Sequence, residues 1–276
     1  MTWEESRAWL ISCLPRAAAY LTRETQEIRL RAGQPVVLVG KGVRLTDWQP
    51  TPEEILRAAE ALTGRSLHAR REEASRGALC VYGGHRLGLC GQTGPEGFSF
   101  LSGFCLRIAG QWPGAADPLV ERFKEPPVSL LLIGPPGSGK TTVLRDLCRQ
   151  WSYRGVQTAL CDERGELAAL WNGAAQLDVG PMTDVLTGCP KGKGILQLIR
   201  TVRPQAVFTD EMDRSELPGI MEAARCGVKI CATAHGAGLG DARKRFKSLV
   251  DCFDGYGVLA NGQVVQVYDR EGKVWE

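Results

Sequence analysis

The stretch "LLIGPPGSGKTTVLRDL", residues 131–147, decides the fold of this chain. It runs from an apolar segment typical of a buried strand, through a glycine-rich loop, into an amphipathic helix. Gly134, Gly139, Lys140 and Thr141 match the spacing G-x-x-x-x-G-K-[ST], in the strand–loop–helix context that a phosphate-binding loop requires. The sequence therefore predicts that this loop binds the phosphates of a nucleotide.

Each part of the loop has a predicted task. The residues expected to contact the nucleotide are Gly134, Pro135, Pro136, Gly137, Ser138, Gly139, Lys140, Thr141 and Thr142. The glycines let backbone N–H groups point inward around phosphates, and the helix that begins at Lys140 adds the partial positive charge of its N-terminus. Lys140 is expected to reach the β- and γ-phosphates, and the Thr141 hydroxyl to coordinate Mg²⁺.

Outward from the loop, the composition is that of a globular protein. The chain has 276 residues, 43% of them hydrophobic, and a formal net charge of +3, which does not support a dedicated nucleic-acid binder. No apolar run approaches the ~20 residues that span a bilayer, and the first residues do not match a secretory signal. The ten cysteines are scattered without metal-ligand spacing, as in a reducing compartment. We expect a cytoplasmic protein.

The pattern of the chain changes near residue 110. Before it, helices are expected from Thr2 to before Pro15 and over residues 51–64, the latter burying Ile55, Leu56, Ala59 and Leu62. Antiparallel strands are expected within 25–46, in a hairpin over 78–94 that turns at Gly83–Gly84, and within 98–110. This predicts an N-terminal α+β domain over residues 1–110.

Proline and glycine cluster between the two parts of the chain, so residues 111–128 are predicted to be a linker. From residue 129 onward, strands and helices alternate, which predicts a parallel sheet covered on both faces over 129–276. The tail carries hairpin signals at Asn261–Gly262 and Glu271–Gly272, and is expected to add antiparallel strands at one edge. The predicted fold class is α/β.

Polar groups follow three later apolar segments, where each predicted strand ends. The first segment ends in Asp162, Glu163, Arg164 and Glu166, the second in Asp210 and Glu211, and the third in His235. Because parallel strands bring their carboxyl ends to one edge of the sheet, these groups should gather beside the phosphate loop.

The residues at this edge suggest the parts of a nucleotide hydrolase. Asp210 is the candidate for the second magnesium-side ligand, acting through water, unless it only caps the following helix. Glu211 is the candidate that polarises the attacking water, and His235 the candidate γ-phosphate sensor. Glu166 and Arg164 fit a catalytic part or a solvated ion pair in a turn equally well.

Arginines are a separate question, because charge on a transferred phosphate is commonly met by an arginine supplied in trans. Arg107, Arg200 and Arg203 are candidates, and a structural role is open for each of them. The run from Asp241 to Lys247 is most simply a solvated helix face.

Seven segments together resemble the stage III sporulation protein AA family. In chain order they are "EIRLRAGQPV", "GHRLGLCG", "GPPGSGKTTVLRDL", "CDERGE", "DVGPMTDVLTGCPK", "TDEM" and "ATAHG", spread over nearly the whole chain. That family is similar to the ATPases that energise type II and type IV secretion and pilus assembly.

The resemblance implies a RecA-like ATPase domain behind a smaller N-terminal domain, with ATP and Mg²⁺ as cofactors. It also implies a ring of six subunits, and a mother-cell cytoplasmic ATPase that serves membrane-embedded proteins of a channel between mother cell and forespore. By this likeness, Glu166 belongs to an acidic box near the metal, and His235 to a histidine motif. The sequence departs from the pattern at Asp213, where a glycine is expected, and "KGKG" at 191–194 is unusually basic.

The leading hypothesis is therefore a Mg²⁺-dependent ATPase that drives assembly or export. A nucleotide-dependent nucleic-acid-binding protein is the alternative, although the near-neutral charge argues against it. The phosphate loop alone does not exclude a small-molecule kinase.

Overall fold

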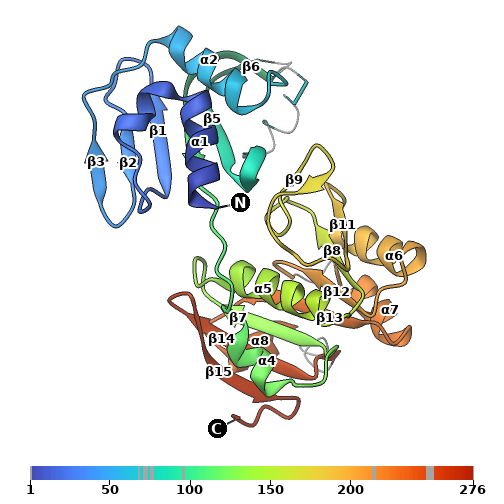
Figure 1. Cartoon of the computed structure of the whole chain (residues 1–276). Helices are drawn as coiled ribbons and strands as arrows, with labels where there is room; N and C mark the ends of the chain where they lie inside the picture. The colour runs from blue at the N-terminus through green and yellow to red at the C-terminus, as the bar shows by residue number, and fades with distance from the viewer. Residues whose placement is uncertain are drawn as a thin grey trace. The chain divides into compact units, whose positions relative to one another are not determined.

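The computed structural model describes residues 2–67, 69–70, 74, 78–94, 97–212, 216–246 and 252–275. By its contacts the chain divides into two compact units, coloured along the chain in Figure 1. Unit 1 comprises Met1–Gly110 and Ala169–Leu177, and unit 2 comprises Gln111–Ala168 and Asp178–Glu276. The domain boundaries at 110 and 128 remain a prediction, because unit 2 takes in the proposed linker and unit 1 a short later segment.

Unit 1 is built on a six-stranded antiparallel sheet, as predicted. Its strand order is β3-β2-β1-β6-β5-β4. The strands are β1 (Glu27–Arg31), β2 (Val37–Val39), β3 (Val43–Leu45), β4 (Leu79–Cys80), β5 (Arg86–Gly94) and β6 (Gly97–Arg107). A short 3-10 turn, Tyr82–Gly84, joins β4 to β5, so the predicted hairpin at Gly83–Gly84 is confirmed.

Two capped helices complete unit 1. Helix α1 (Trp3–Cys13) begins with a capping box between Thr2 and Glu5, and α2 (Pro52–Leu62) with another between Thr51 and Glu54. A single 3-10 turn, Pro15–Ala19, follows α1. Helix α2 packs Ile55, Ala58, Ala59 and Leu62 into the core of the unit.

One predicted core residue of α2 is wrong: Leu56 is 45% exposed, and Ala58 takes the buried place instead. The helical period of 3.6 residues is compatible with burial of either Leu56 or Ala58, because Leu56 lies at the border of the apolar face of α2. The packing against β6 decides which side of that border is buried.

Unit 2 contains a seven-stranded sheet of order β11-β8-β12-β13-β7-β14-β15. The strands are β7 (Leu130–Gly134), β8 (Thr158–Asp162), β11 (Thr183–Thr187), β12 (Ala206–Thr209), β13 (Lys229–His235), β14 (Gly255–Ala260) and β15 (Gln263–Asp269). All neighbours pair in parallel except β14 and β15, so the predicted parallel sheet is confirmed. The expected antiparallel edge is right for β15 and wrong for β14, which extends the parallel sheet beside β7.

Helices cover both faces of this sheet, as predicted. Helices α4 (Asp117–Arg122) and α5 (Lys140–Tyr153) pack on one face with Leu130, Leu132 and Phe208. The other face is covered by α6 (Lys191–Thr201), α7 (Leu217–Arg225) and α8 (Leu239–Phe246). Each face has its own core, and the sheet between them is fully buried at its centre.

The segment Ala169–Leu177 groups with unit 1, although it lies within the later part of the sequence. It forms a two-stranded hairpin of β9 (Leu170–Trp171) and β10 (Ala174–Ala175). Trp171 packs against the core of unit 1, and the side chain of Gln176 accepts a hydrogen bond from the Gly83 N–H at 2.9 Å. Each helix among the described residues is too short or too polar to span a lipid bilayer.

Candidate functional site: the phosphate loop and the adjacent strand ends

The phosphate loop connects β7 to α5, as the motif requires. Gly137 and Gly139 have φ of 74° and 88°, a region that side chains with a Cβ rarely adopt. A Cβ on Gly139 would also lie 2.9 Å from the Cα of Gly262. The glycine spacing is therefore required by the backbone conformation and by close packing.

The turn between β14 and β15 supports the loop from outside. Gly262 donates its N–H to the carbonyl of Ser138 at 3.2 Å, and it packs against Gly139. The Asn261–Gly262 turn predicted from the sequence thus lies directly against the phosphate loop.

Lys140, His235 and Glu211 form one continuous chain of polar contacts. The Nζ of Lys140 lies 3.3 Å from the Nδ1 of His235, and the Nε2 of His235 lies 3.2 Å from the Oε1 of Glu211. Because an ammonium only donates and a carboxylate only accepts, this arrangement assigns the proton of a neutral imidazole to Nε2. Lys140 also donates to the carbonyls of Gly134 and Pro135, at 2.9 and 2.8 Å.

The backbone of Glu211 adopts an unusual conformation, with φ of 35°. Its N–H donates to the Thr233 hydroxyl at 2.7 Å, and its carbonyl accepts from the Lys191 Nζ at 2.9 Å. Burial raises the pKa of the Glu211 carboxyl, but Arg164 and the hydrogen bond from His235 outweigh it, so the pKa lies below its usual value. Glu211 is thus held ionised in a strained conformation, which is typical of functional sites.

Asp210 lies beneath Glu211 and is only 1% exposed. Burial, opposed by Lys191 and assisted by the nearby charges of Asp162 and Glu166, raises its pKa to about 6. Its Oδ1 is 3.4 Å from the Nζ of Lys191 and accepts no hydrogen bond of good geometry within the described part of the chain. This oxygen is therefore available to a further partner.

Lys191 is a site residue that the sequence did not identify, as are Thr233 and Arg245, which contact Glu211 and His235. Lys191 is 5% exposed at the first position of α6, and its Nζ contacts both Asp210 and the carbonyl of Glu211. The signal was present in the unusually basic "KGKG", where one lysine of the pair is buried and Lys193 is exposed.

The acidic box divides into a structural part and a part near the site. Asp162 is fully buried and accepts hydrogen bonds from the backbone N–H groups of Glu166, Leu167 and Ala168, so it shapes the turn after β8. Arg164 forms an ion pair with Glu211 at 2.9 Å. The carboxyl of Glu166 is near enough to raise the pKa of Asp210.

A cavity of about 620 Å³ lies beside Glu211 and His235. Its charged lining consists of four cationic side chains, Arg164, Lys191, Lys193 and Arg245, and three carboxylates, Glu163, Glu211 and Glu216. Arg245 also donates to the carbonyl of His235 at 2.7 Å. The contacts from Lys140 through His235 to Glu211 thus connect the phosphate loop to a cavity lined by both cationic and acidic side chains.

The candidate arginines lie elsewhere. Arg200 and Arg203 precede β12, at the edge of the sheet opposite to the strand ends that carry the site. Arg107 ends β6 in unit 1 and lies 3.7 Å from Glu27. Asp213 and Lys247 lie outside the described residues.

The residues of the site fit ATP and Mg²⁺. The loop offers backbone N–H groups, and the hydroxyl of Ser138 and the Oδ1 of Asp210 are buried without a hydrogen-bond partner among the described residues. Thr141 and Asp210 offer the oxygen ligands that Mg²⁺ prefers. The described residues contain no cluster of three or more His, Cys, Asp or Glu that could hold a metal.

Comparison with known proteins adds a family. The model of the family described as "Sporulation stage III, protein AA" matches residues 12–275. The chain is 35% identical over 272 residues to stage III sporulation protein AA of Bacillus subtilis (strain 168), covering 91% of this chain and 89% of that protein.

Solved structures with a similar fold include two ATPases or motors. The Legionella pneumophila ATPase DotB is 15% identical with a TM-score of 0.61, over 97% of this chain and 78% of DotB. The pilus retraction motor PilT, solved with bound ADP, is 18% identical with a TM-score of 0.64, over 90% of this chain and 77% of PilT. At this identity the likeness shows the fold, so the predicted RecA-like ATPase fold with a smaller N-terminal α+β part is confirmed.

Proposed function

The chain belongs to the sporulation stage III protein AA family, and on that basis we propose that it is a Mg²⁺-dependent ATP hydrolase. Hydrolysis of ATP by this protein would energise assembly of, or transport through, a secretion-like channel between mother cell and forespore. The observation that carries the proposal is the chain of contacts from Lys140 through His235 to Glu211, which joins the phosphate loop to a candidate base.

In the proposed mechanism the protein positions its substrate and neutralises charge. Backbone N–H groups of residues 137–142, which follow the two prolines of the loop, would surround the phosphates. Lys140 would exchange its contacts with loop carbonyls for contacts with the β- and γ-phosphates. Glu211 orients the attacking water and accepts its proton, since the carboxylate is ionised and held by His235. His235 contacts both Lys140 and Glu211, so it is placed to respond to the γ-phosphate.

Thr141 would hold Mg²⁺ directly and Asp210 would hold it through water. When bound, Mg²⁺ would supply positive charge that neutralises the charge developing on the phosphates. Lys191 balances the buried carboxylate of Asp210 and fixes the carbonyl of Glu211. Glu166 lies near this group and is the second candidate to position water.

We propose that a neighbouring subunit or unit 1 supplies a further arginine to the phosphates, because charge on a transferred phosphate is commonly met by an arginine in trans. Arg107, 68% exposed at its side chain, is the candidate, and a ring of six subunits would provide it in trans. We place the protein in the mother-cell cytoplasm, peripheral to the membrane through membrane-embedded partners. The names of DotB as an ATPase and PilT as a motor support the proposed hydrolysis of ATP.

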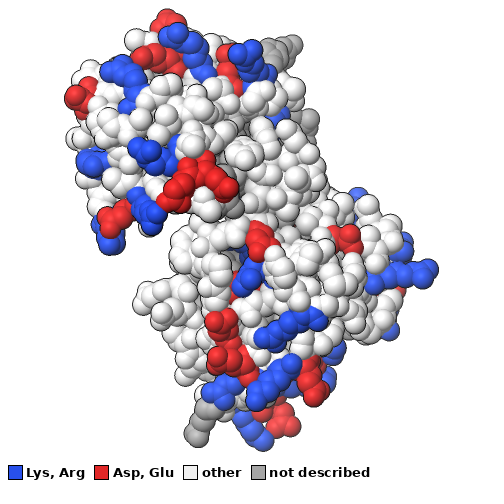
Figure 2. Space-filling model, in the orientation of Figure 1, with Lys and Arg blue, Asp and Glu red and all other residues white. Residues whose placement is uncertain are grey.

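The alternative, a nucleotide-dependent nucleic-acid-binding protein, finds no support on the face in Figure 2. There Lys and Arg side chains alternate with Asp and Glu, so this face offers no continuous basic surface. Nucleic-acid binding depends on such a surface for its affinity.

The proposal is tested by the steady-state rate of phosphate release from Mg-ATP against protein concentration, read beside the mass of the assembly. We expect the specific activity to rise as the subunits associate, because an arginine in trans contributes about 10³-fold or more to catalysis. Absence of turnover at every concentration would exclude an ATPase. A specific activity independent of assembly would keep the ATPase and reject the arginine in trans.

A further inference from the structure

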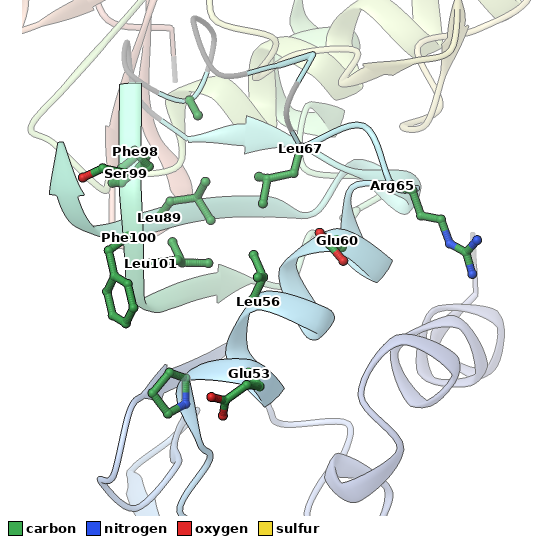
Figure 3. Close-up of a pocket in the computed structure, with 12 residues that line it drawn as sticks. Glu53, Leu56, Glu60, Arg65, Leu67, Leu89, Phe98, Ser99, Phe100 and Leu101 are labelled. Atoms are coloured by element: carbon green, nitrogen blue, oxygen red, sulfur yellow. The ribbon is translucent and has the colours of Figure 1, made fainter. Parts of the chain in front are cut away.

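Unit 1 contains an apolar groove that the nucleotide site does not use. A cavity of about 520 Å³ lies between α2 and the β5–β6 hairpin. Figure 3 shows Leu56, Leu67, Leu89 and Leu101 pointing toward one another across it, from α2, the segment after it and the two strands. Leu67, Leu89 and Leu101 also belong to the core of unit 1 or pack against it, so the floor of the groove is continuous with that core.

The wall formed by α2 has an acidic edge. Glu53, Leu56 and Glu60 are spaced i, i+3 and i+7, so they share a helix face distinct from the one buried in the core. The two carboxylates are about 10 Å apart along the helix axis, at a rise of about 1.5 Å per residue. Both are exposed, and neither forms an ion pair within the described residues.

The opposite wall is a bent hairpin. The register of β5 and β6 shifts between Cys90 and Gly91 and again between Gln92 and Thr93. Such bulges bend and twist a strand pair. Phe100, on the edge of this wall, is 50% exposed, and Leu56, on the other wall, is 45% exposed. Two large apolar side chains are thus left in water on the two sides of one groove.

We propose that the groove binds an amphipathic helix of a partner protein that carries lysine or arginine beside its apolar face. Apolar side chains of the helix would enter between the leucines, and its basic side chains would pair with Glu53 and Glu60. The charged groups lie along an edge and do not converge on the centre, which fits a helix in a groove better than a small polar ligand. Arg65 also lines the groove, but its side chain extends away from the leucines in Figure 3.

The test uses two fluorescein-labelled helical peptides of about 18 residues, or five turns. One carries leucine on one face and lysine on the other, and its twin has glutamate in place of lysine. With the full chain, fluorescence anisotropy should show binding of the lysine peptide in preference to the glutamate peptide. The double variant Glu53→Lys with Glu60→Lys should reverse that preference.

A second pair of variants tests the apolar part. Leu56→Asp should weaken binding of the lysine peptide by about tenfold or more, since a buried apolar contact would be lost. Val43→Asp is the matched control, because Val43 is 72% exposed on β3 of the same unit and outside the groove. An unchanged thermal unfolding midpoint in each variant shows that the fold is retained, and no step requires ATP hydrolysis.

Three results would overturn the proposal. The wild-type chain could bind neither peptide at concentrations of tens of micromolar. The charge reversal could leave the preference unchanged, which would place the peptide elsewhere. Leu56→Asp could behave as Val43→Asp does toward the peptide while dissociating an oligomer of the chain, which would make the groove a contact between copies.

Discussion

Glu211 is held by hydrogen bonds from three directions. Thr233 of β13 accepts from its N–H, Lys191 of α6 donates to its carbonyl, and His235 contacts its carboxylate. A non-glycine residue with positive φ costs about 1–3 kcal/mol, so these bonds must maintain the strained backbone. Precise placement of the carboxylate is what an orienting base needs.

Lys191→Met should therefore lower ATP turnover by about 10- to 100-fold, with a smaller effect on KM, because the Glu211 carbonyl loses its donor. The pKa of Asp210, now about 6, should rise when its ion pair is lost, so the acidic limb of kcat/KM should move to higher pH. Lys191→Arg should restore part of the activity. Lys193→Met, at the exposed neighbour, serves as the control, and equal activity in the two methionine variants would contradict the role of Lys191.

His85 is a second buried titratable group, in unit 1. Its Nδ1 accepts from the N–H of Ala109 at 2.9 Å and its Nε2 lies 3.0 Å from the Ser6 hydroxyl, and burial lowers its pKa to about 4. The folded pKa lies below the unfolded value of 6.5, so the unfolded state binds more protons between these values. The neutral histidine thus supports stability above pH 6.5, and this support is lost progressively as the pH falls toward 4.

We predict that His85→Gln removes this contribution, which amounts to about 3 kcal/mol between pH 6.5 and 4 at 1.36 kcal/mol per pKa unit. Urea unfolding of wild type and variant at several pH values gives the difference in their free energies of unfolding. The contributions of carboxylates that both proteins share cancel in this difference. An identical pH dependence in the two proteins would show that His85 does not titrate in this way.

Among the elements, the β14–β15 turn packs against the phosphate loop and supports it. Gly137 and Gly139 both have positive φ, but only Gly139 packs against Gly262, while nothing lies within 4 Å of a Cβ on Gly137. A substitution at Gly137 therefore tests backbone strain alone, whereas one at Gly139 tests strain together with a steric clash.

Gly139→Ala should weaken binding of a fluorescent ATP analogue much more than Gly137→Ala does, because only the first adds a clash with the C-terminal hairpin. The strain common to both is about 1 kcal/mol, or about fivefold in affinity. Equal losses in the two variants would show that the hairpin turn does not support the loop.

The elements most visible in the sequence were those with local signals. The phosphate loop, both capping boxes and the Asn261–Gly262 turn depend on a few adjacent residues, and the structure contains all of them. Long-range pairing was less predictable: β14 lies parallel to β7, and Leu56 remains exposed, because both depend on which distant surface packs against the element.

The same limit applied within the site. Strand ends placed Asp210, Glu211 and His235 at the correct edge, since parallel strands share a direction. Lys191 comes from a helix N-terminus, and nothing in its immediate sequence fixes its side chain on Asp210. Asp162 was expected at the site because it ends a strand, but its carboxylate accepts hydrogen bonds from three backbone N–H groups of its own turn.

At the scale of the whole molecule, the nucleotide site and the groove belong to different units. Residues of unit 2 make up the loop, the acidic pair and the histidine, whereas unit 1 carries the groove and Arg107. The chain enters unit 1 a second time through Ala169–Leu177. This segment begins seven residues after the end of β8 at Asp162. The sequence did not indicate this return, because a segment of nine residues is too short to show a change in composition.

Glu211 is proposed to serve hydrolysis and not nucleotide binding, so ATP affinity and phosphate release should be measured together in Glu211→Gln. We expect affinity close to that of wild type and turnover reduced by about 10²-fold or more, because the amide keeps the shape of the carboxylate but accepts no proton. Glu166→Gln, the other candidate carboxylate, should retain most of its turnover. Full turnover in Glu211→Gln would contradict the account, and its loss in Glu166→Gln alone would move the base to that residue.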